Sequence, residues 1–356
     1  MKLCFLTATP LDVIRGSGTY AGISTLAGAL AELGVEVELV TPRWPVPVFT
    51  LRRLLFNERL RWTSHLKAHV MVGFDMDGYR IAGRLGYPHV ACIKGVIADE
   101  MRFERGLTRA TMAIQAACEA RHVRRADLVV TTSRYAAGRL RELYGLRSEI
   151  ALVPEMIDLA RWRALFERNP ASPRPEGFVV LTVCRFYPRK RLNVLLEAAG
   201  RLRGRIPGLE VRIVGGGPQA SKLRALADRL RLGPIVRWLG NLSQERLAFE
   251  YNQADVFCLP SVQEGFGIVF LEAMAAGKPI VAARAAAVPE VVTAGLLVEP
   301  DDPEALATAL ENLCRDRELR QALGAAGRQQ VRRYAAPEVA RLFLDTVCSL
   351  LGSGPR

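Results

Sequence analysis

This chain of 356 residues contains few histidines, few cysteines and no long apolar run. The seven cysteines are scattered singly, without the short spacings of a metal site, so we expect reduced core thiols and a cytoplasmic protein. No apolar run approaches the roughly 20 residues that cross a bilayer. The N-terminal apolar stretch is short and lacks a cleavage site, so it predicts a first strand and not a signal peptide.

Acidic residues are also scarce relative to basic ones. The chain has 36 Asp and Glu against 49 Lys and Arg, a net charge of +13. This excess fits either a genome that favours arginine or an anionic partner, such as phosphate esters, an acidic membrane surface or nucleic acid. Because the sequence has no aromatic-studded basic sheet, zinc spacing or recognition-helix signature, we expect no nucleic-acid partner.

One basic segment, residues 49–62, interleaves bulky apolar residues with four arginines, Arg52, Arg53, Arg59 and Arg61. Such a pattern is typical of a peripheral contact with an anionic membrane, here at its inner face, in which Phe56, Leu60 and Trp62 would meet the lipid. The alternative, a solvated helix face with leucines pointing to the core, stays open at this point.

Strand-like and helix-like segments alternate along the chain, which predicts an α/β fold with two doubly wound, Rossmann-like lobes facing each other across a cleft. The proline-rich stretch 169–177 predicts the linker. The first lobe would span residues 1–168 and the second 178–335. One amphipathic helix over 329–350 would lead the chain back towards the first lobe. The last part of the chain, about 336–356, would pack on that lobe.

Two glycine-rich stretches could contact phosphate. Gly16-Ser-Gly18 should lead from a strand over 3–7 into a helix over about 20–33, and Gly215-Gly216-Gly217 follows a strand over 210–214. Neither carries the full dinucleotide fingerprint, because the first lies too far from its strand and no ribose-binding carboxylate follows. Both would offer backbone amides at a helix N-terminus to a phosphate or sugar oxygen.

Charged residues gather where the strands of the second half should end. Arg185 and Lys190 leave one predicted strand, and Glu264 follows another, in a glycine-flanked loop. Glu272 lies eight positions further, on the apolar helix that begins after the loop. Because ligands bind at the carboxyl ends of parallel strands, this edge is the predicted site.

These motifs resemble those of a known family. The sequence resembles the retaining glycosyltransferases of family 4, the glycosyl transferases group 1, which have the GT-B fold. Three motifs carry the resemblance: the Arg-x4-Lys strand exit, the string VRIVGGGP at 211–218 and the Glu-x7-Glu arrangement at 264–272. The resemblance implies transfer of a hexose-type sugar from a nucleoside-diphosphate sugar to an acceptor, either lipid-linked or a growing glycan.

The resemblance also implies roles for individual residues. Glu264 would contact the donor hexose, Glu272 the ribose, and Arg185 and Lys190 the diphosphate. The remaining donor-binding residues would be Gly18, Gly216, Leu242, Phe266, Gly267 and Ile268. The leaving group would be neutralised without metal or cofactor, and we interpret Asp75-Met76-Asp77 as a chance metal-like string.

Two departures from the family pattern affect the acceptor side. Lys94-Gly95 replaces a common His-Gly, and Pro154-Glu-Met-Ile-Asp158 replaces a string ending in Asn-Gly-Val-Asp. We expect Lys94 to act catalytically with Glu264, Arg185 and Lys190 by donating to a sugar hydroxyl or phosphate. Two alternatives remain, a catalytically weak donor-binding subunit and a sugar-nucleotide epimerase. The histidines His65, His69, His89 and His122 look unpartnered and receive no role.

Overall fold

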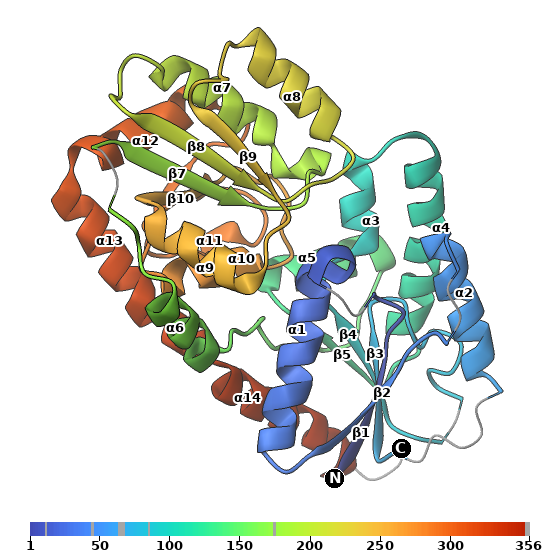
Figure 1. The fold of residues 1–356 in the computed structure, drawn as a ribbon. Helices are drawn as coiled ribbons and strands as arrows, with labels where there is room; N and C mark the ends of the chain where they lie inside the picture. The colour runs from blue at the N-terminus through green and yellow to red at the C-terminus, as the bar shows by residue number, and fades with distance from the viewer. Residues whose placement is uncertain (11–12, 44–45, 63–67, 85, 174–175, 353–356) are drawn as a thin grey trace. The chain divides into compact units, whose positions relative to one another are not determined.

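A computed structural model describes residues 1–10, 13–43, 46–62, 68–84, 86–173 and 176–352 (Figure 1). The chain forms two compact units. The first comprises Met1–Met156 together with the C-terminal segment from Ala336, and the second comprises Ile157–Ala335. In the described ranges no helix is long and apolar enough to cross a membrane.

The first unit is built on a parallel sheet with the strand order β2-β1-β3-β4-β5-β6. Its middle strands are apolar along their length because helices cover both faces, and helix α1 packs against the C-terminal helix α14 (Figure 1). The strands are β1 (Lys2–Leu6), β2 (Glu36–Val40), β3 (Val70–Phe74), β4 (His89–Ile93), β5 (Leu128–Thr131) and β6 (Ile150–Leu152). The helices are α1 (Val13–Glu32), α2 (Phe49–Leu60), α3 (Ile97–Glu100), η1 (Met101–Phe103), α4 (Gly106–Val123), α5 (Arg134–Tyr144) and α14 (Ala336–Gly352).

The second unit repeats this architecture with the strand order β12-β11-β10-β7-β8-β9. The strands are β7 (Phe178–Val183), β8 (Leu209–Val214), β9 (Val236–Gly240), β10 (Val256–Leu259), β11 (Ile280–Ala283) and β12 (Leu296–Val298). The helices are α6 (Leu159–Arg168), η2 (Pro188–Lys190), α7 (Leu192–Leu202), α8 (Ala220–Arg229), α9 (Gln244–Gln253), α10 (Ile268–Ala275), α11 (Val288–Val291), α12 (Pro303–Arg315), α13 (Arg317–Gln330) and η3 (Val331–Tyr334).

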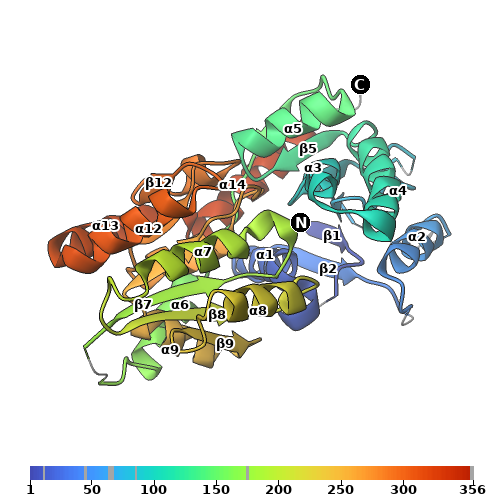
Figure 2. The ribbon, with the colours of Figure 1, turned by 90° about the horizontal axis from the view of Figure 1, so that it is seen from above.

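Both faces of the second sheet are buried. Along β7, Val180 points into the core shared with α7, α8 and α12, whereas Val179 and Leu181 point into the core shared with α6, α9 and α10. Figure 2 shows α7 and α8 lying along the β7–β9 part of the sheet. The predicted fold class, two doubly wound parallel sheets, is therefore confirmed.

The boundary between the units lies earlier than expected. The predicted first lobe, residues 1–168, includes helix α6, but this helix belongs to the second unit, which begins at Ile157. The reason is packing, because Trp162 and Leu165 are buried in the core that also holds Tyr251 of α9.

The single helix expected over 329–350 is wrong. Helix α13 ends at Gln330, a short 3-10 turn follows, and α14 begins at Ala336. Pro337 explains the break, since a helix running through it would lose a backbone hydrogen bond and clash with the preceding turn. In α14, Val339, Phe343 and Val347 are buried in the core of the first unit.

Helix α1 begins at Val13, about seven residues before the predicted start, so Gly16 and Gly18 lie inside the helix and not in a loop before it. Each helical glycine costs about 1 kcal/mol. Burial of Ile23, Leu26 and Leu30 against the sheet favours the helix by more than that.

The basic segment 49–62 forms α2, and the structure corrects its predicted lipid contacts. Phe56 and Leu60 are buried in the core, and Arg53 is 4% exposed. The exposed apolar side chains are Phe49, Leu51 and Leu55 on the helix and Val48 and Trp62 beside its ends, and Arg61 is also exposed. The inner face of α2 therefore packs on the core, and the contact of its outer face with a membrane stays a prediction.

Candidate active site

Lys190 and Glu264 meet at the carboxyl edge of the second sheet. Lys190 ends the turn η2 after β7, and Glu264 lies in the loop after the neighbouring strand β10. The Lys190 ammonium donates to Glu264 Oε1 at 2.5 Å, and the two side chains are only 12% and 8% exposed. The amide of Val262 also donates to the carbonyl of Arg189 at 2.9 Å, so the two loops are joined through their backbones.

The glycine loop after β8 lies against the same strand exit. Gly215 has φ +117°, and a Cβ there would lie 2.0 Å from the carbonyl oxygen of Cys184, so only glycine fits. The amide of Phe186 donates to the carbonyl of Gly216 at 3.0 Å. A Cβ on Gly216 would meet nothing within 4 Å, so this glycine borders open space. The loop therefore lies beside Arg185, which is half-buried at the exit of β7.

The N-terminus of α10 contributes backbone amides at this edge. Gly267 caps the helix with φ +93°, and a Cβ there would lie 2.6 Å from the Phe270 ring. The first N–H groups of a helix have no acceptor within it and carry the positive end of the helix dipole. The amides of Phe266, Gly267 and Ile268 therefore suit a phosphate or sugar oxygen.

Glu272 lies one turn further along α10, on the same face as Ile268. Its Oε2 accepts a hydrogen bond of 2.9 Å from the hydroxyl of Tyr251 on α9. Burial raises the pKa of Glu272 to about 7. The hydrogen bond from Tyr251 lowers this pKa, but by less than burial raises it. The sequence did not indicate Tyr251 as a partner, because its position on α9 fits an ordinary core aromatic.

The remaining predicted donor residues take different positions. Leu242 follows β9 and is partly buried against the second unit's core. Gly18 is exposed within α1 of the first unit, and its amide does not lie at the helix N-terminus. The donor-binding roles of these residues stay predictions.

Lys94 leaves β4 in the first unit and is held by a second residue that the sequence did not single out. Its ammonium donates to Glu155 Oε2 at 3.0 Å, and the side chains are 6% and 5% exposed. The Lys94 amide donates to Asp75 Oδ1 at 3.0 Å. Lys94 is therefore fixed at both its backbone and its side chain.

The prediction that the histidines lack partners is wrong. His89 and His122 are buried, and their Nε2 atoms are 2.8 Å apart. His122 Nδ1 lies 2.5 Å from the carbonyl of Asp75, and burial lowers the pKa of His122 to about 4, so this ring is neutral and donates to that carbonyl. His69 Nδ1 accepts from the amide of Lys2 at 3.0 Å. These contacts are structural, and His65 lies outside the described residues.

Asp77 explains the metal-like string. Its fully buried carboxylate accepts hydrogen bonds from Arg53, Asn57 and the amide of Ala8. Asp77 therefore has a structural role, since it anchors α2 to the sheet. In the part of the chain that the structure describes, no group of three or more His, Cys, Asp or Glu could hold a metal ion.

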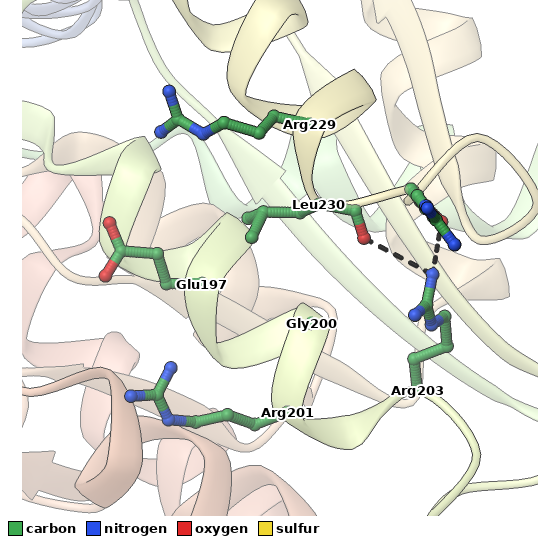
Figure 3. Close-up of a pocket in the computed structure, with 7 residues that line it drawn as sticks. Glu197, Gly200, Arg201, Arg203, Arg229 and Leu230 are labelled. Carbon is green, nitrogen blue, oxygen red and sulfur yellow. Dashed lines mark hydrogen bonds between the residues drawn. The ribbon is translucent and has the colours of Figure 1, made fainter.

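A separate basic cleft of about 400 Å³ lies between α7 and α8 (Figure 3). It is formed where these helices end, and so lies at the amino edge of the sheet, opposite the predicted donor residues. Arg203 Nη1 donates to the carbonyls of Leu230 and Arg231 at 3.3 and 2.7 Å, which caps the end of α8. Arg201 pairs with Glu304. We therefore assign these two arginines a structural role.

The sequence matches two family models in succession. The model described as Glycosyltransferase Family 4 matches residues 16–161, and the model described as Glycosyl transferases group 1 matches residues 166–330. The first match lies almost entirely in the first unit and the second in the second unit.

Curated relatives include the GDP-mannose-dependent alpha-(1-6)-phosphatidylinositol monomannoside mannosyltransferase of Mycolicibacterium smegmatis, 34% identical over 220 residues, which are 57% of this chain and 57% of the relative. The D-inositol 3-phosphate glycosyltransferase of Corynebacterium kroppenstedtii is 34% identical over 255 residues, 67% of this chain and 56% of the relative. The chain thus spans a little over half the length of the curated relatives it matches.

Solved structures share the fold across nearly the whole chain. Sucrose-phosphate synthase from Thermosynechococcus elongatus matches with a TM-score of 0.84 at 22% identity, covering 99% of this chain and 100% of its own. WaaG, a glycosyltransferase involved in lipopolysaccharide biosynthesis, matches with a TM-score of 0.74 at 18% identity over 99% and 100% of the two chains. At these identities the likeness shows the fold, GT-B. With both units matched by family models, the chain belongs to glycosyltransferase family 4, the group 1 glycosyl transferases.

Proposed function

We propose that this protein transfers a hexose-type sugar from a nucleoside-diphosphate sugar to an acceptor with retention of the anomeric configuration. The observation that carries the proposal is the meeting of Lys190, Glu264 and the N-terminus of α10 at one sheet edge. Retention follows the family pattern. The family and its relatives favour a transferase over a binding subunit or an epimerase.

The chemistry requires stabilisation of a leaving group. Breaking the bond between sugar and phosphate places negative charge on the diphosphate, and cations and helix dipoles aimed at that charge lower the barrier. An ammonium has three N–H donors, so Lys190 can keep its bond to Glu264 and still bind a phosphate oxygen. With Arg185 and the α10 amides, these side chains would supply the positive charge without a metal ion.

The acceptor and location form a second part of the proposal. The mannosyltransferase relative is named for a phosphatidylinositol acceptor, which supports a lipid-linked or glycan acceptor here. The exposed apolar side chains of α2, with Arg52, Arg59 and Arg61 around them, suit the surface of an anionic membrane. We infer a cytoplasmic protein that rests on the inner face of the membrane. The free cysteines support this compartment.

The test is turnover of a panel of UDP- and GDP-sugars by purified protein, with donor affinity measured by calorimetry. We expect one donor class to be consumed, and Lys190→Met to weaken its binding by about 10- to 100-fold. This loss corresponds to about 1.5–3 kcal/mol for a hydrogen bond to a charged group. Arg229→Ala, which removes a cation of the basic cleft, should leave affinity unchanged.

Other outcomes identify the alternatives. Binding without turnover of any donor would indicate a donor-binding subunit, and an epimerised nucleotide sugar would indicate an epimerase. Absence of binding to every donor would overturn the proposed site.

A further inference from the structure

We propose that Glu155 is a positioning residue for Lys94. Its carboxylate holds the Lys94 ammonium at the carboxyl edge of the first sheet, and Lys94 contributes to the reaction only while this pair is intact. The inference rests on the proposed transferase function and extends it to a residue that the family pattern does not assign.

The pair joins segments that are distant in the sequence. Lys94 directly follows β4, whereas Glu155 follows β6, with β5 between these strands in the sheet. The 3.0 Å contact between Nζ and Oε2 spans 61 positions in sequence. Taking both charges out of water costs several kcal/mol per ion, and apolar residues often fill such a space at no loss of stability. A buried ion pair beside a sheet edge that binds ligands is therefore poorly explained by stability alone.

The surrounding backbone is shaped to hold this pair. The Lys94 amide is fixed by Asp75, and the next turn is fixed by the bond from the Ile97 amide to Glu119 Oε2 at 2.8 Å. On the other side, α1 makes room for the carboxylate, because a Cβ on Gly22 would lie 2.6 Å from Glu155 Oε2. Three elements thus restrict the position of one ammonium.

The ammonium keeps donors for a ligand. Within the described residues Glu155 is its only hydrogen-bond partner, which uses one of its three N–H groups. The remaining two can donate to a sugar hydroxyl or a phosphate oxygen. The Lys94–Glu155 pair carries no net charge. The carboxylate therefore keeps the buried lysine protonated, and no uncompensated cation is left in the interior.

Electrostatics support the dependence of Lys94 on its partner. Burial by itself lowers the pKa of Lys94, and Glu155, through its charge and its hydrogen bond, together with the charge of Asp75 opposes this effect, so that the pKa is raised overall. Glu155 contributes the largest of these opposing effects. Without it, burial would favour neutral lysine and the ammonium would be lost at a lower pH.

The two departures from the family pattern coincide in this pair. Lys94 stands where the family pattern described above has histidine, and Glu155 belongs to the string that replaces Asn-Gly-Val-Asp in that pattern. A cation introduced at one position is matched by a carboxylate at the other, which is the arrangement expected if the two positions work together.

The experiment compares Glu155→Gln, Glu155→Asp, Lys94→Met and the double variant Lys94→Met/Glu155→Gln, with exposed Glu142→Gln as control. We expect Glu155→Gln to lower kcat for the donor on the order of 10- to 100-fold, the scale of losses from a misplaced group. KM should change little. In Glu155→Gln the alkaline limb of the pH–rate profile should shift to a lower pH by at least about one unit. Glu155→Asp should restore much of the rate. The double variant should be no slower than Lys94→Met.

A direct measurement separates this inference from the proposed function. In ¹⁵N-labelled protein, the pH midpoint of the Lys94 ammonium signal should fall in Glu155→Gln relative to wild type and stay in place in Glu142→Gln. An unchanged midpoint, or a wild-type pH–rate profile in a folded Glu155→Gln variant, would overturn the inference. If Glu155→Gln does not fold, the double variant Glu155→Asp/Lys94→Met takes its place. The inference would then be overturned if the free-energy losses in kcat of the two single variants simply add in the double variant. Absence of turnover in wild type with a shifted midpoint would overturn the proposed function alone.

Discussion

At the scale of single residues, the two glutamates of the Glu-x7-Glu motif have different environments. Glu264 is held by the Lys190 ammonium at 2.5 Å, so its negative charge is compensated. Glu272 faces the neutral phenol of Tyr251, and burial raises its pKa to about 7. Two residues of the same type therefore differ in behaviour: the carboxylate of Glu264 is held by a cation, whereas Glu272 changes its charge near neutral pH.

The pKa of Glu272 predicts pH-dependent donor binding. A carboxyl group with a pKa of about 7 must lose its proton to accept two hydrogen bonds from a ribose. Donor affinity should therefore fall as the pH is lowered from 8 to 6, by up to about tenfold per unit below the pKa. In Glu272→Gln the affinity should be low at pH 8 and nearly constant. Calorimetric titrations at three pH values check this. Equal pH dependence in wild type and Glu272→Gln would contradict it.

At the scale of secondary-structure elements, α2 joins a buried polar network to an exposed apolar surface. Arg53 Nη2 donates to Asp77 Oδ2 at 3.1 Å, and Asn57 Nδ2 donates to Asp77 Oδ1 at 3.1 Å. Desolvation would lower the pKa of Arg53, but the Asp77 and Asp75 carboxylates raise it overall. The helix is thus anchored on one face and free to contact a partner on the other.

Removing Arg53 should destabilise the first unit. Arg53→Met leaves the Asp77 carboxylate buried without its cation, a change that typically costs about 3–5 kcal/mol. Urea unfolding should therefore show a lower midpoint. Arg61→Met removes a surface pair with Glu58 and should cost less than about 1 kcal/mol. Similar midpoints in the two variants would show that the Arg53 network contributes little.

The outer face of α2 should control membrane binding. We expect the protein to sediment with anionic vesicles at low salt and to be released as salt rises, since each basic residue near such a surface contributes about 1 kcal/mol. Leu51→Glu/Leu55→Glu should abolish binding, and Leu107→Glu on α4, where the leucine is more exposed to solvent than either, should not. Arg53 is unsuitable for this test because it is buried. If wild-type protein stays in the supernatant, the membrane contact is refuted and the transferase proposal is unaffected.

At the scale of the whole molecule, the chain builds two parallel sheets with separate cores and returns to the first with its last helix. Val339 and Phe343 of α14 share a core cluster with Leu26 and Leu30 of α1. The first unit therefore requires both ends of the described chain. The charges proposed to neutralise the leaving group belong to side chains and a helix N-terminus of the second unit.

This arrangement predicts that turnover does not need an added metal. Donor consumption in excess EDTA should remain within about twofold of its initial rate, since Arg185 and Lys190 supply positive charge. A metal-dependent transferase assayed beside it serves as the control for chelation. Complete loss of activity in EDTA, restored by Mn²⁺ or Mg²⁺, would overturn the metal-independent mechanism.

Elements whose pattern is local could be predicted from the order of the amino acids. The strands expected over 3–7 and 210–214 are found as β1 (Lys2–Leu6) and β8 (Leu209–Val214), within one residue at each end, because a short apolar run bounded by turn residues marks a strand locally. The order of strands and charged loops along the second half also placed Lys190 and Glu264 at one sheet edge, since the carboxyl ends of parallel strands share an edge. The fold class and the position of the candidate donor site were therefore predictable.

Which side chains contact each other depends on how the chain folds in three dimensions. Lys94 pairs with Glu155, and Tyr251 with Glu272, through strand order and helix packing that no spacing in the sequence encodes. Packing also assigned α6 to the second unit and buried Phe56 and Leu60 on the inner face of α2. Periodicity fixes which residues can share a face. Which face is covered, and by which partner, depends on contacts between segments far apart in the chain.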